Sequence, residues 1–435
     1  MEWYFTFLIA ISALLALMAI GLPIAFAFGV VGFVGLAVVA GPQIALQSLR
    51  LNAWSTPLNW LLLAIPLFIL MAEIVVFSGI VSDVYESLSR FFGGFPGSLA
   101  LSSFVAATGF AAVTGSSVAS TATIGLAGLP EMRARGYKGS FAAGCIAAGG
   151  GLAIIIPPSL LFILYGYIAQ VSVIALFIAG VIPGFMMAIG RILLTIAWVR
   201  HNPSIAPPGP SLPRRERVVA LARIWPVPLL AIIILGSIYF GIASITESAA
   251  MGAFGAVLMA LYYRRFSFKA MRDASMAAAR TTGFLMLIIV CAVFFGYFLA
   301  YLGVTPALSR FVANVGVSPL VALLIINLVF LVLGAVMDTA SIVLVVIPII
   351  LPGLVGLGLD PIWLGVILAV NLEIGLITPP VGMNLYVMHG IAEKYGITFE
   401  DIFRGAAPFI VVDVIVIGLV IAFPELALWL PSQIR

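Results

Sequence analysis

The sequence is poor in charge, histidine and cysteine. Only 8% of its 435 residues are Asp, Glu, Lys or Arg, whereas about a quarter of a typical soluble domain is charged. The two cysteines, Cys145 and Cys291, lie in apolar runs without a partner at metal-ligand spacing, so we expect them to be small packing residues. No basic helix or aromatic-basic patch suggests a nucleic-acid partner. These shortages exclude a soluble domain.

Catalytic side chains are equally scarce. His389 stands alone, His201 lies in a predicted loop, and no Ser/His pair, paired Asp or metal-ligand set meets at membrane depth. An intramembrane enzyme, such as a protease, is therefore a poor interpretation. We expect no enzymatic activity and no cofactor.

Apolar residues dominate instead. At 63% hydrophobic content, the chain is expected to be an all-α polytopic membrane protein with ten or more spans, each of roughly 20 residues. The first apolar run lacks a basic leader and a cleavage site, which favours a retained span. A charged segment at 80–92 with apolar residues at helical spacing predicts an interfacial helix. The predicted spans are 3–20, 22–40, 57–78, 184–200, 225–243, 246–263, 281–302 and 405–423, with a second interfacial helix at 306–315.

The chain repeats itself at an offset of 222 residues. The matched positions are Ser116-Ser117 with Asp338-Thr339, Pro130 with Pro352, Gly136 with Gly358, Phe141 with Trp363, and Pro157-Pro158 with Pro379-Pro380. Coincident prolines and glycines mark matching backbone breaks, which indicates an internal repeat.

Each half is predicted to contain a re-entrant hairpin and a helix broken by its double proline. The divisions are 1–200 with hairpin 96–132 and broken helix 139–180, a cytoplasmic linker at 201–223, and 224–435 with hairpin 319–352 and broken helix 361–392. An unpaired backbone group costs several kcal/mol in hydrocarbon, so paired breaks at membrane depth suggest a transporter binding site. The alternative is that each double proline only kinks a buried helix.

The basic residues predict an orientation. Sixteen of the 20 Lys and Arg residues fall in segments that are cytoplasmic if the linker is, whereas Arg50, Arg310 and Arg435 face outward. Arg191 lies inside a span and is expected to snorkel towards the cytoplasmic face. Five crossings plus one hairpin in each half is an odd number of crossings, so the repeats are expected to have inverted topology.

The breaks bring oxygen donors into the membrane. The first cation site is predicted at Thr114, Ser116, Ser117, Ala153, Ile156 and Pro158, and the second at Asp338, Thr339, Gly375, Thr378 and Pro380. An Asp at membrane depth costs roughly 2.5–3.5 kcal/mol, which a bound cation would offset. Alternatively, Asp338 is paired or protonated, and the serines permit close helix packing.

Other polar residues at membrane depth give weaker signals. A substrate cavity is predicted near Ser159, Asn371 and Asn384. For Glu73, Glu247, Glu373 and Asp413 structural pairs are favoured over relays.

Several motifs carry a family resemblance. They are Gly115-Ser116-Ser117-Val118-Ala119, Ile156-Pro157-Pro158-Ser159, Leu176 to Gly184, Gly334 to Asp338, and Ile377-Thr378-Pro379-Pro380-Val381-Gly382-Met383-Asn384-Leu385-Tyr386. With them, essentially the whole chain resembles the large membrane subunit of tripartite ATP-independent periplasmic (TRAP) transporters. The resemblance implies a sodium-coupled, elevator-type importer of organic acids in the bacterial inner membrane. Its implied partners are a small four-helix membrane subunit and a periplasmic substrate-binding protein.

The resemblance also implies site residues. The family's first sodium site corresponds to Thr114, Ser116, Ala153, Ile156 and Pro158, and its second to Asp338, Thr378 and Met383. This chain departs from the family pattern at Thr114, often Ser, and Ala153, often Gly, but the hydroxyl and the carbonyl survive both changes.

The sequence therefore predicts a secondary transporter with an ion-coupled midplane site. A stand-alone sodium/carboxylate symporter and a structural membrane scaffold are the alternatives. The substrate is undetermined among dicarboxylates, keto acids, sugar acids and sialic acids.

Overall fold

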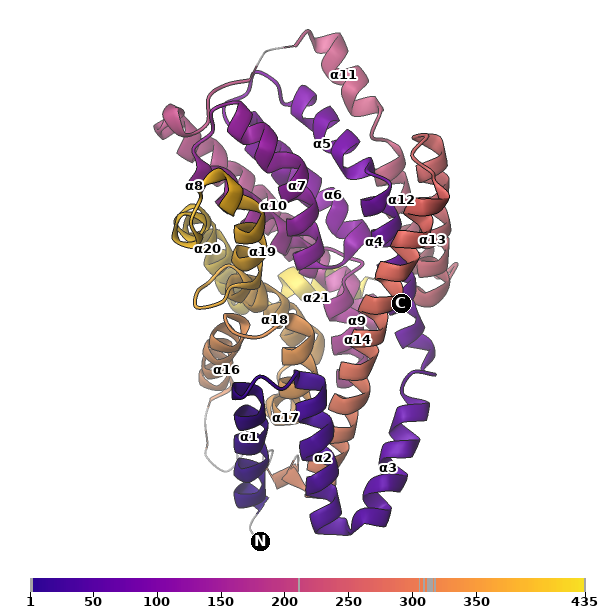
Figure 1. The fold of residues 1–435 in the computed structure, drawn as a ribbon. Helices are drawn as coiled ribbons and strands as arrows, with labels where there is room; N and C mark the ends of the chain where they lie inside the picture. Colours follow the sequence, from indigo (N-terminus) through magenta and orange to yellow (C-terminus); the bar gives the residue numbers. More distant parts are fainter. Residues whose placement is uncertain are drawn as a thin grey trace.

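The computed structural model describes residues 3–433 apart from 210–211, 305, 308–309, 311–315 and 317. Throughout these residues the structure is helical and contains no strand (Figure 1). The helices of the first half are α1 Trp3–Ala19, α2 Ile24–Ala40, α3 Pro42–Ser55, η1 Trp60–Leu63, α4 Ala64–Phe77, α5 Ile80–Phe91, α6 Ser98–Thr114, α7 Ser117–Ala134, α8 Gly139–Gly151, η2 Leu152–Ile154, α9 Leu160–Ala169 and α10 Val173–His201.

The remaining helices follow the predicted linker. They are η3 Pro203–Ile205, α11 Arg214–Ala222, α12 Pro226–Tyr239, α13 Ile245–Tyr262, α14 Phe268–Tyr301, α16 Pro319–Gly334, α17 Thr339–Gly356, α18 Pro361–Leu376, α19 Met383–Ala392, η4 Glu393–Tyr395, α20 Phe399–Ala422 and α21 Glu425–Ser432. Helices α3, α11 and α21 are additions to the sequence prediction. The second predicted interfacial helix, 306–315, lies mostly outside the described residues.

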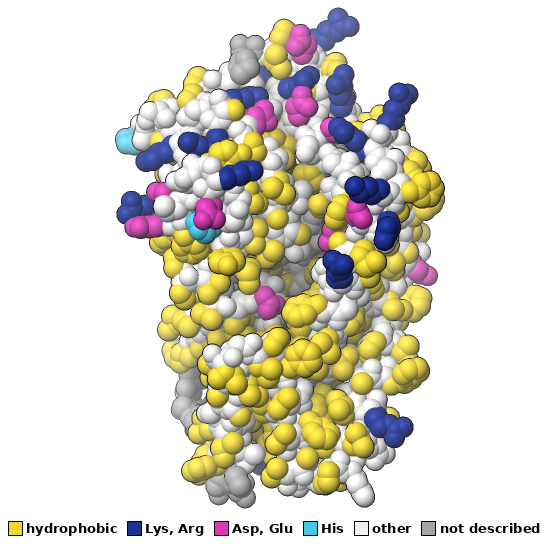
Figure 2. Space-filling view, in the orientation of Figure 1, with side chains coloured by type: hydrophobic (Ala, Val, Ile, Leu, Met, Phe, Trp, Pro, Cys, Tyr) yellow, Lys and Arg dark blue, Asp and Glu magenta, His cyan; other side chains and the backbone are white. Residues whose placement is uncertain are grey.

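The surface is that of a membrane protein. Six helical segments are long and apolar enough to cross a membrane, judged on the described residues. Large apolar side chains such as Phe254 and Leu328 are more than half exposed, at 65% and 62%. Figure 2 shows hydrophobic side chains over most of the visible face and Lys and Arg gathered at its upper end, near α5 and α11 in Figure 1. Apolar side chains therefore face lipid, and the charge is concentrated at one end.

Helix α5 is amphipathic as predicted, but protein covers its apolar face. Val84 and Leu88 are buried, and the hydroxyl of buried Tyr85 donates a hydrogen bond to the Leu99 carbonyl of α6 at 3.2 Å. The structure thus keeps the predicted amphipathic helix, but other helices of the protein, and not the membrane interface, cover its apolar face. Helix α5 packs on the α6–α7 hairpin and on α11.

The segment after the first double proline ends earlier than predicted. Helix α9 ends because Gln170 adopts a left-handed conformation with φ +55°, and Ser172 then caps α10 by accepting the Ala175 N–H at 3.2 Å. Helix α10 continues through Pro183 for 29 residues. The predicted limit at 180 and the separate span from 184 are wrong, because the turn at Gln170 divides the helices and Pro183 does not.

Two helices begin earlier than the sequence predicts, because their first turns are polar. Helix α14 begins at Phe268 rather than 281, and α20 begins at Phe399 rather than 405. Ser267 caps α14 by accepting the Ala270 N–H at 3.0 Å, and Thr398 forms a capping box at α20. An apolar run marks only the membrane-embedded part of a helix, whereas capping side chains mark its true start.

Small residues place α8 at the centre of the molecule. Every residue of α8 from Phe141 to Gly151 is buried. A Cβ added at Gly144 would collide with the Gly405 backbone of α20, and one added at Gly150 would collide with Thr121 of α7. Close backbone approach between helices requires such small residues. The carboxyl end of α8 is thereby held against the hairpin formed by α6 and α7.

Candidate functional site

The first hairpin tip lies against the first double proline. Helix α6 ends at Thr114 and is followed by Gly115, whose φ is +57°, and Ser116 caps α7 by accepting the Ala119 N–H at 3.4 Å. The Gly115 carbonyl accepts the Leu160 N–H at 3.3 Å. A Cβ added at Gly115 would lie 2.8 Å from the Pro158 carbonyl oxygen. Only glycine therefore combines this conformation with this contact.

These contacts unite the two parts of the first predicted cation site. Thr114 at the tip is buried, and its hydroxyl donates to the Phe110 carbonyl at 3.0 Å. Its lone pairs remain available as acceptors. From the other side, Ala153 of η2 is buried, as are Ile156 and Pro158 in the segment between η2 and α9. The arrangement supplies hydroxyl and carbonyl oxygens, the ligand type that a hard cation takes.

The second hairpin tip lies against the second double proline in a similar way. The Ala335 carbonyl accepts the N–H groups of Val381 and Gly382 at 3.0 and 3.1 Å. A Cβ added at Gly375 of α18 would lie 2.6 Å from the Gly334 Cα. The tip of the α16–α17 hairpin is therefore fixed to both helices of the second break.

Asp338 caps α17 at this second tip. Its Oδ2 accepts the Ser341 N–H at 3.0 Å, and its Oδ1 accepts the Ser341 hydroxyl. In the second helix break, the Thr378 hydroxyl donates to the Ile374 carbonyl at 2.6 Å. A carboxylate has about four acceptor positions, so lone pairs remain for a cation. Ser341 was missed by sequence reasoning, although a Ser three residues after a capping Asp is a local signal.

The other predicted members of the second site differ in exposure. Gly375 is buried, Thr339 and Met383 are half-buried, and Pro380 is exposed. Met383 is the first residue of α19.

The predicted substrate residues are engaged with other protein groups. The Asn384 amide accepts from the Ser117 hydroxyl at 2.9 Å and donates to the Ala147 carbonyl at 3.2 Å. Asn371 donates to the Asn327 side chain at 2.5 Å. The Ser159 hydroxyl donates to the Ile154 carbonyl.

The Ser117–Asn384 contact joins the first turn of α7 to the first turn of α19. Two helix N-termini, which carry partial positive charge, thus lie together at the break. This arrangement favours an anion.

A buried ion cluster accompanies these sites. Arg191 of α10 lies 2.6 Å from Glu373 of α18 and 2.7 Å from Asp413 of α20, and all three side chains are fully buried. The expectation that Arg191 snorkels to the surface is wrong, because two carboxylates hold it in the interior. The favoured structural role of Glu373 and Asp413 agrees with these contacts. Arg191 and Asp413 are 222 residues apart, which is the offset of the predicted repeat, so opposite charges at matched positions were an available signal.

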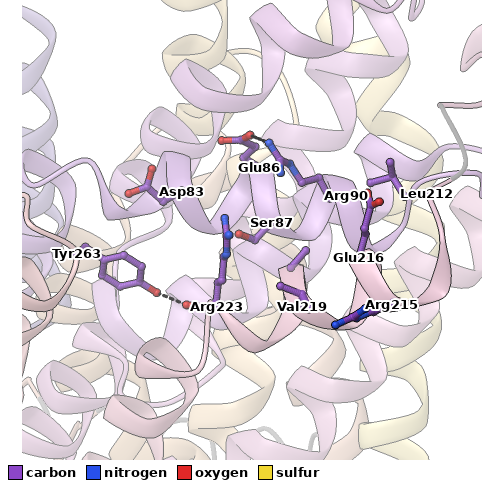
Figure 3. Close-up of a pocket in the computed structure, with 11 residues that line it drawn as sticks. Asp83, Glu86, Ser87, Arg90, Leu212, Arg215, Glu216, Val219, Arg223 and Tyr263 are labelled. Carbon is purple, nitrogen blue, oxygen red and sulfur yellow. Dashed lines mark hydrogen bonds and ion pairs between the residues drawn. The ribbon is translucent and has the colours of Figure 1, made fainter.

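A separate charged cavity of about 550 Å³ lies between α5 and α11. It is lined by Asp83, Glu86, Ser87, Arg90, Leu212, Arg215, Glu216, Val219, Ala220, Arg223 and Tyr263. Figure 3 shows the Glu86–Arg90 ion pair and the hydrogen bond from Tyr263 to the Arg223 carbonyl. None of the predicted site residues lines this cavity, so it is distinct from the helix breaks.

Comparison with known proteins gives consistent similarities. A family model for the DctM component of the tripartite ATP-independent periplasmic transporter matches residues 11–426. The chain is 34% identical over 390 residues to the C4-dicarboxylate TRAP transporter large permease protein DctM of Pseudomonas aeruginosa, covering 89% of this chain and 90% of that protein. It is 32% identical over 429 residues to the 2,3-diketo-L-gulonate TRAP transporter large permease protein YiaN of Escherichia coli, covering 96% and 97%.

A solved structure also resembles this one. The crystal structure of the YdaH transporter of Alcanivorax borkumensis superimposes with a TM-score of 0.62 at 16% identity, covering 89% of this chain and 90% of that one. This likeness shows a shared fold.

Proposed function

The chain belongs to the DctM component family of TRAP transporters, and from this premise we propose that it carries an organic carboxylate inward with sodium. The large permease subunit of such a system must bind its cargo at membrane depth and release it on the other side. The sites at the two helix breaks provide the groups for this task.

The observation that carries the proposal is the pairing of hairpin tips with helix breaks. Leu160 donates to the first tip at Gly115, and Val381 donates to the second tip at Ala335. Unwound backbone and half-helix ends at membrane depth supply ion ligands in secondary transporters. The Thr114 hydroxyl at the first break, and the Thr378 hydroxyl and Asp338 carboxylate at the second, add oxygen donors of the kind that sodium takes.

A carboxylate substrate fits the charge of the site. The N-termini of α7 and α19 meet through Ser117 and Asn384, and paired helix N-termini attract anions. The relatives named above are permeases for C4-dicarboxylates and for 2,3-diketo-L-gulonate, and both substrates are organic acids. In this proposal, bound sodium adds positive charge next to the anion.

The arrangement of the halves supports alternating access by inverted repeats. Figure 1 shows the α6–α7 hairpin in the upper half of the molecule and α16 and α17 in the lower half. Entry of equivalent hairpins from opposite sides gives each access route its own gate. In our proposal the helices around both breaks move together across the membrane, in an elevator-type motion relative to the other helices.

Family membership also supports two partners and a location. We propose that the chain works in the bacterial inner membrane with a small four-helix subunit and a periplasmic substrate-binding protein. The basic end, with α5 and α11, would face the cytoplasm.

Reconstitution tests this function. The chain and both partners are placed in proteoliposomes, and uptake of labelled C4-dicarboxylates, keto acids, sugar acids and sialic acids is measured with sodium or potassium outside. We expect uptake of one organic acid class that requires an inward sodium gradient and the binding protein. Uptake by the chain alone would identify a stand-alone symporter, and equal uptake in potassium would contradict sodium coupling.

A further inference from the structure

Arg191 contacts three helices from the middle of α10. Its Nη1 donates to the Ala148 carbonyl of α8 at 2.6 Å, and Nη1 also lies 2.6 Å from Glu373 of α18. Its Nε and Nη2 donate to Asp413 of α20 at 2.7–3.2 Å. The guanidinium is thus hydrogen-bonded to Asp413 and to the Ala148 carbonyl, whereas it meets Glu373 as an ion pair without a hydrogen bond, and none of the Arg191 side chain is exposed.

This cluster lies between the two broken helices. Glu373 precedes Gly375, the α18 residue that packs on the second hairpin tip at Gly334. On the other side, a Cβ added at Gly151 would lie 2.6 Å from Glu373 Oε1, and Gly151 precedes Ala153 of the first predicted cation site. One side-chain cluster therefore contacts the backbone of α8 and the side chain of α18 next to both breaks.

The strength of these contacts makes the spacing of the helices rigid. Removing one partner of a buried ion pair is strongly destabilising, because the other charge is left unpaired. A guanidinium is also a planar fork, so it holds its hydrogen-bond partners Asp413 and Ala148 in fixed directions and keeps one charged nitrogen beside Glu373. The single flexible ammonium of lysine does not do this. A shift of α8 must then move Arg191, and Arg191 must move α18 or lose a contact.

We propose that Arg191 is a positioning residue that couples the two cation sites of the transporter. Its guanidinium holds α8 and α18 in one relative position, so that a cation bound at the first break favours the geometry needed at the second. This inference rests on the proposed sodium-coupled function. It adds that the two cations bind cooperatively and that the cooperativity passes through the Arg191–Glu373–Asp413 cluster.

Arg191→Lys tests the coupling because it keeps the charge and removes the fork. Sodium binding is measured on purified protein, from the sodium dependence of its melting temperature and intrinsic fluorescence, and sodium-dependent uptake is measured in the reconstituted complex. In the unaltered protein we expect a Hill coefficient above one. In Arg191→Lys we expect it to fall to about one, with half-saturation shifted to higher sodium.

A matched control lies one turn further along α10. Thr195 is also fully buried, and its hydroxyl donates to the Arg191 backbone carbonyl at 2.8 Å without contact to the carboxylates. Thr195→Val should lower thermal stability without lowering the Hill coefficient, which separates a coupling role from a merely structural one.

Gly151→Ala perturbs the same cluster from α8 if Arg191→Lys does not fold. Gly151 has a helical φ of −57°, so alanine fits its backbone, and the added methyl displaces Glu373. A reduced Hill coefficient in either variant supports the coupling. An unchanged Hill coefficient in every folded variant would overturn it. Absence of any sodium response in the unaltered protein would instead contradict the proposed function itself.

Discussion

At the scale of single residues, Gly115 lets the first hairpin tip reach the helix break. A side chain there is disfavoured twice, by the positive φ and by the nearby Pro158 carbonyl. We expect Gly115→Ala to cost about 1–2 kcal/mol for the left-handed backbone alone, and to reduce sodium-dependent uptake by moving Thr114 and Ser116. Gly109→Ala is the control, because a Cβ added at Gly109 of α6 meets no atom within 4 Å. Equal uptake by the Gly115→Ala and Gly109→Ala proteins would show that the geometry of the hairpin tip does not affect transport.

In the proposed second sodium site, Asp338 is the residue whose charge we expect to matter most. Asparagine caps a helix as well as aspartate does, so Asp338→Asn keeps α17 capped and removes only the charge. We expect sodium-driven uptake to fall at least about tenfold, since contacts to a charged group are worth about 1.5–3 kcal/mol. Melting curves in detergent should show a protein that still folds.

Asp360→Asn provides the matched control. Asp360 caps α18 through the N–H groups of Ile362 and Trp363 but is exposed. Its replacement should leave uptake within about twofold of the unaltered protein. If Asp338→Asn also retained full uptake, Asp338 would have no part in coupling.

At the scale of elements, the crossing of α8 and α20 depends on two glycines. A Cβ added at Gly405 would collide with the Ser140 carbonyl of α8. Forcing a methyl into such a contact typically costs about 1–3 kcal/mol. Gly405→Ala should therefore lower the melting temperature in detergent and the yield of folded protein.

Gly418 lies on the same helix with nothing within 4 Å of an added Cβ. Gly418→Ala should leave stability unchanged or raise it by up to about 1 kcal/mol, because alanine is the better helix former. Similar melting temperatures for the Gly405→Ala and Gly418→Ala proteins would show that α8 and α20 can move apart without loss of stability.

At the scale of the whole molecule, the distribution of basic residues predicts the orientation in the membrane. Figure 1 places α11 at the upper end and α3 at the lower end. Arg215 of α11 and Gln47 of α3 are both exposed. With Cys145 and Cys291 replaced by alanine, Arg215→Cys and Gln47→Cys are treated with a membrane-impermeant maleimide on spheroplasts. We expect labelling of the Gln47→Cys protein in intact spheroplasts and labelling of the Arg215→Cys protein only after lysis, and the reverse result would invert the orientation.

The same molecule shows which structural features can be read from the chain. Proline and glycine constrain the local backbone in any context, so the double prolines and the Gly115 turn marked the helix breaks directly. The turn at Gln170 could not be anticipated, because a left-handed glutamine has no strong sequence signature. The starts of α14 and α20 were missed because their first turns are polar.

Composition and the paired prolines thus determined by themselves a helical membrane protein with two broken helices, because these features act through solvent and local backbone geometry. Only the tertiary structure decided that Arg191 is buried between Glu373 and Asp413 and that Ser117 bonds to Asn384. A side chain's partner depends on which distant helices pack beside it. A single apolar span does not carry that information.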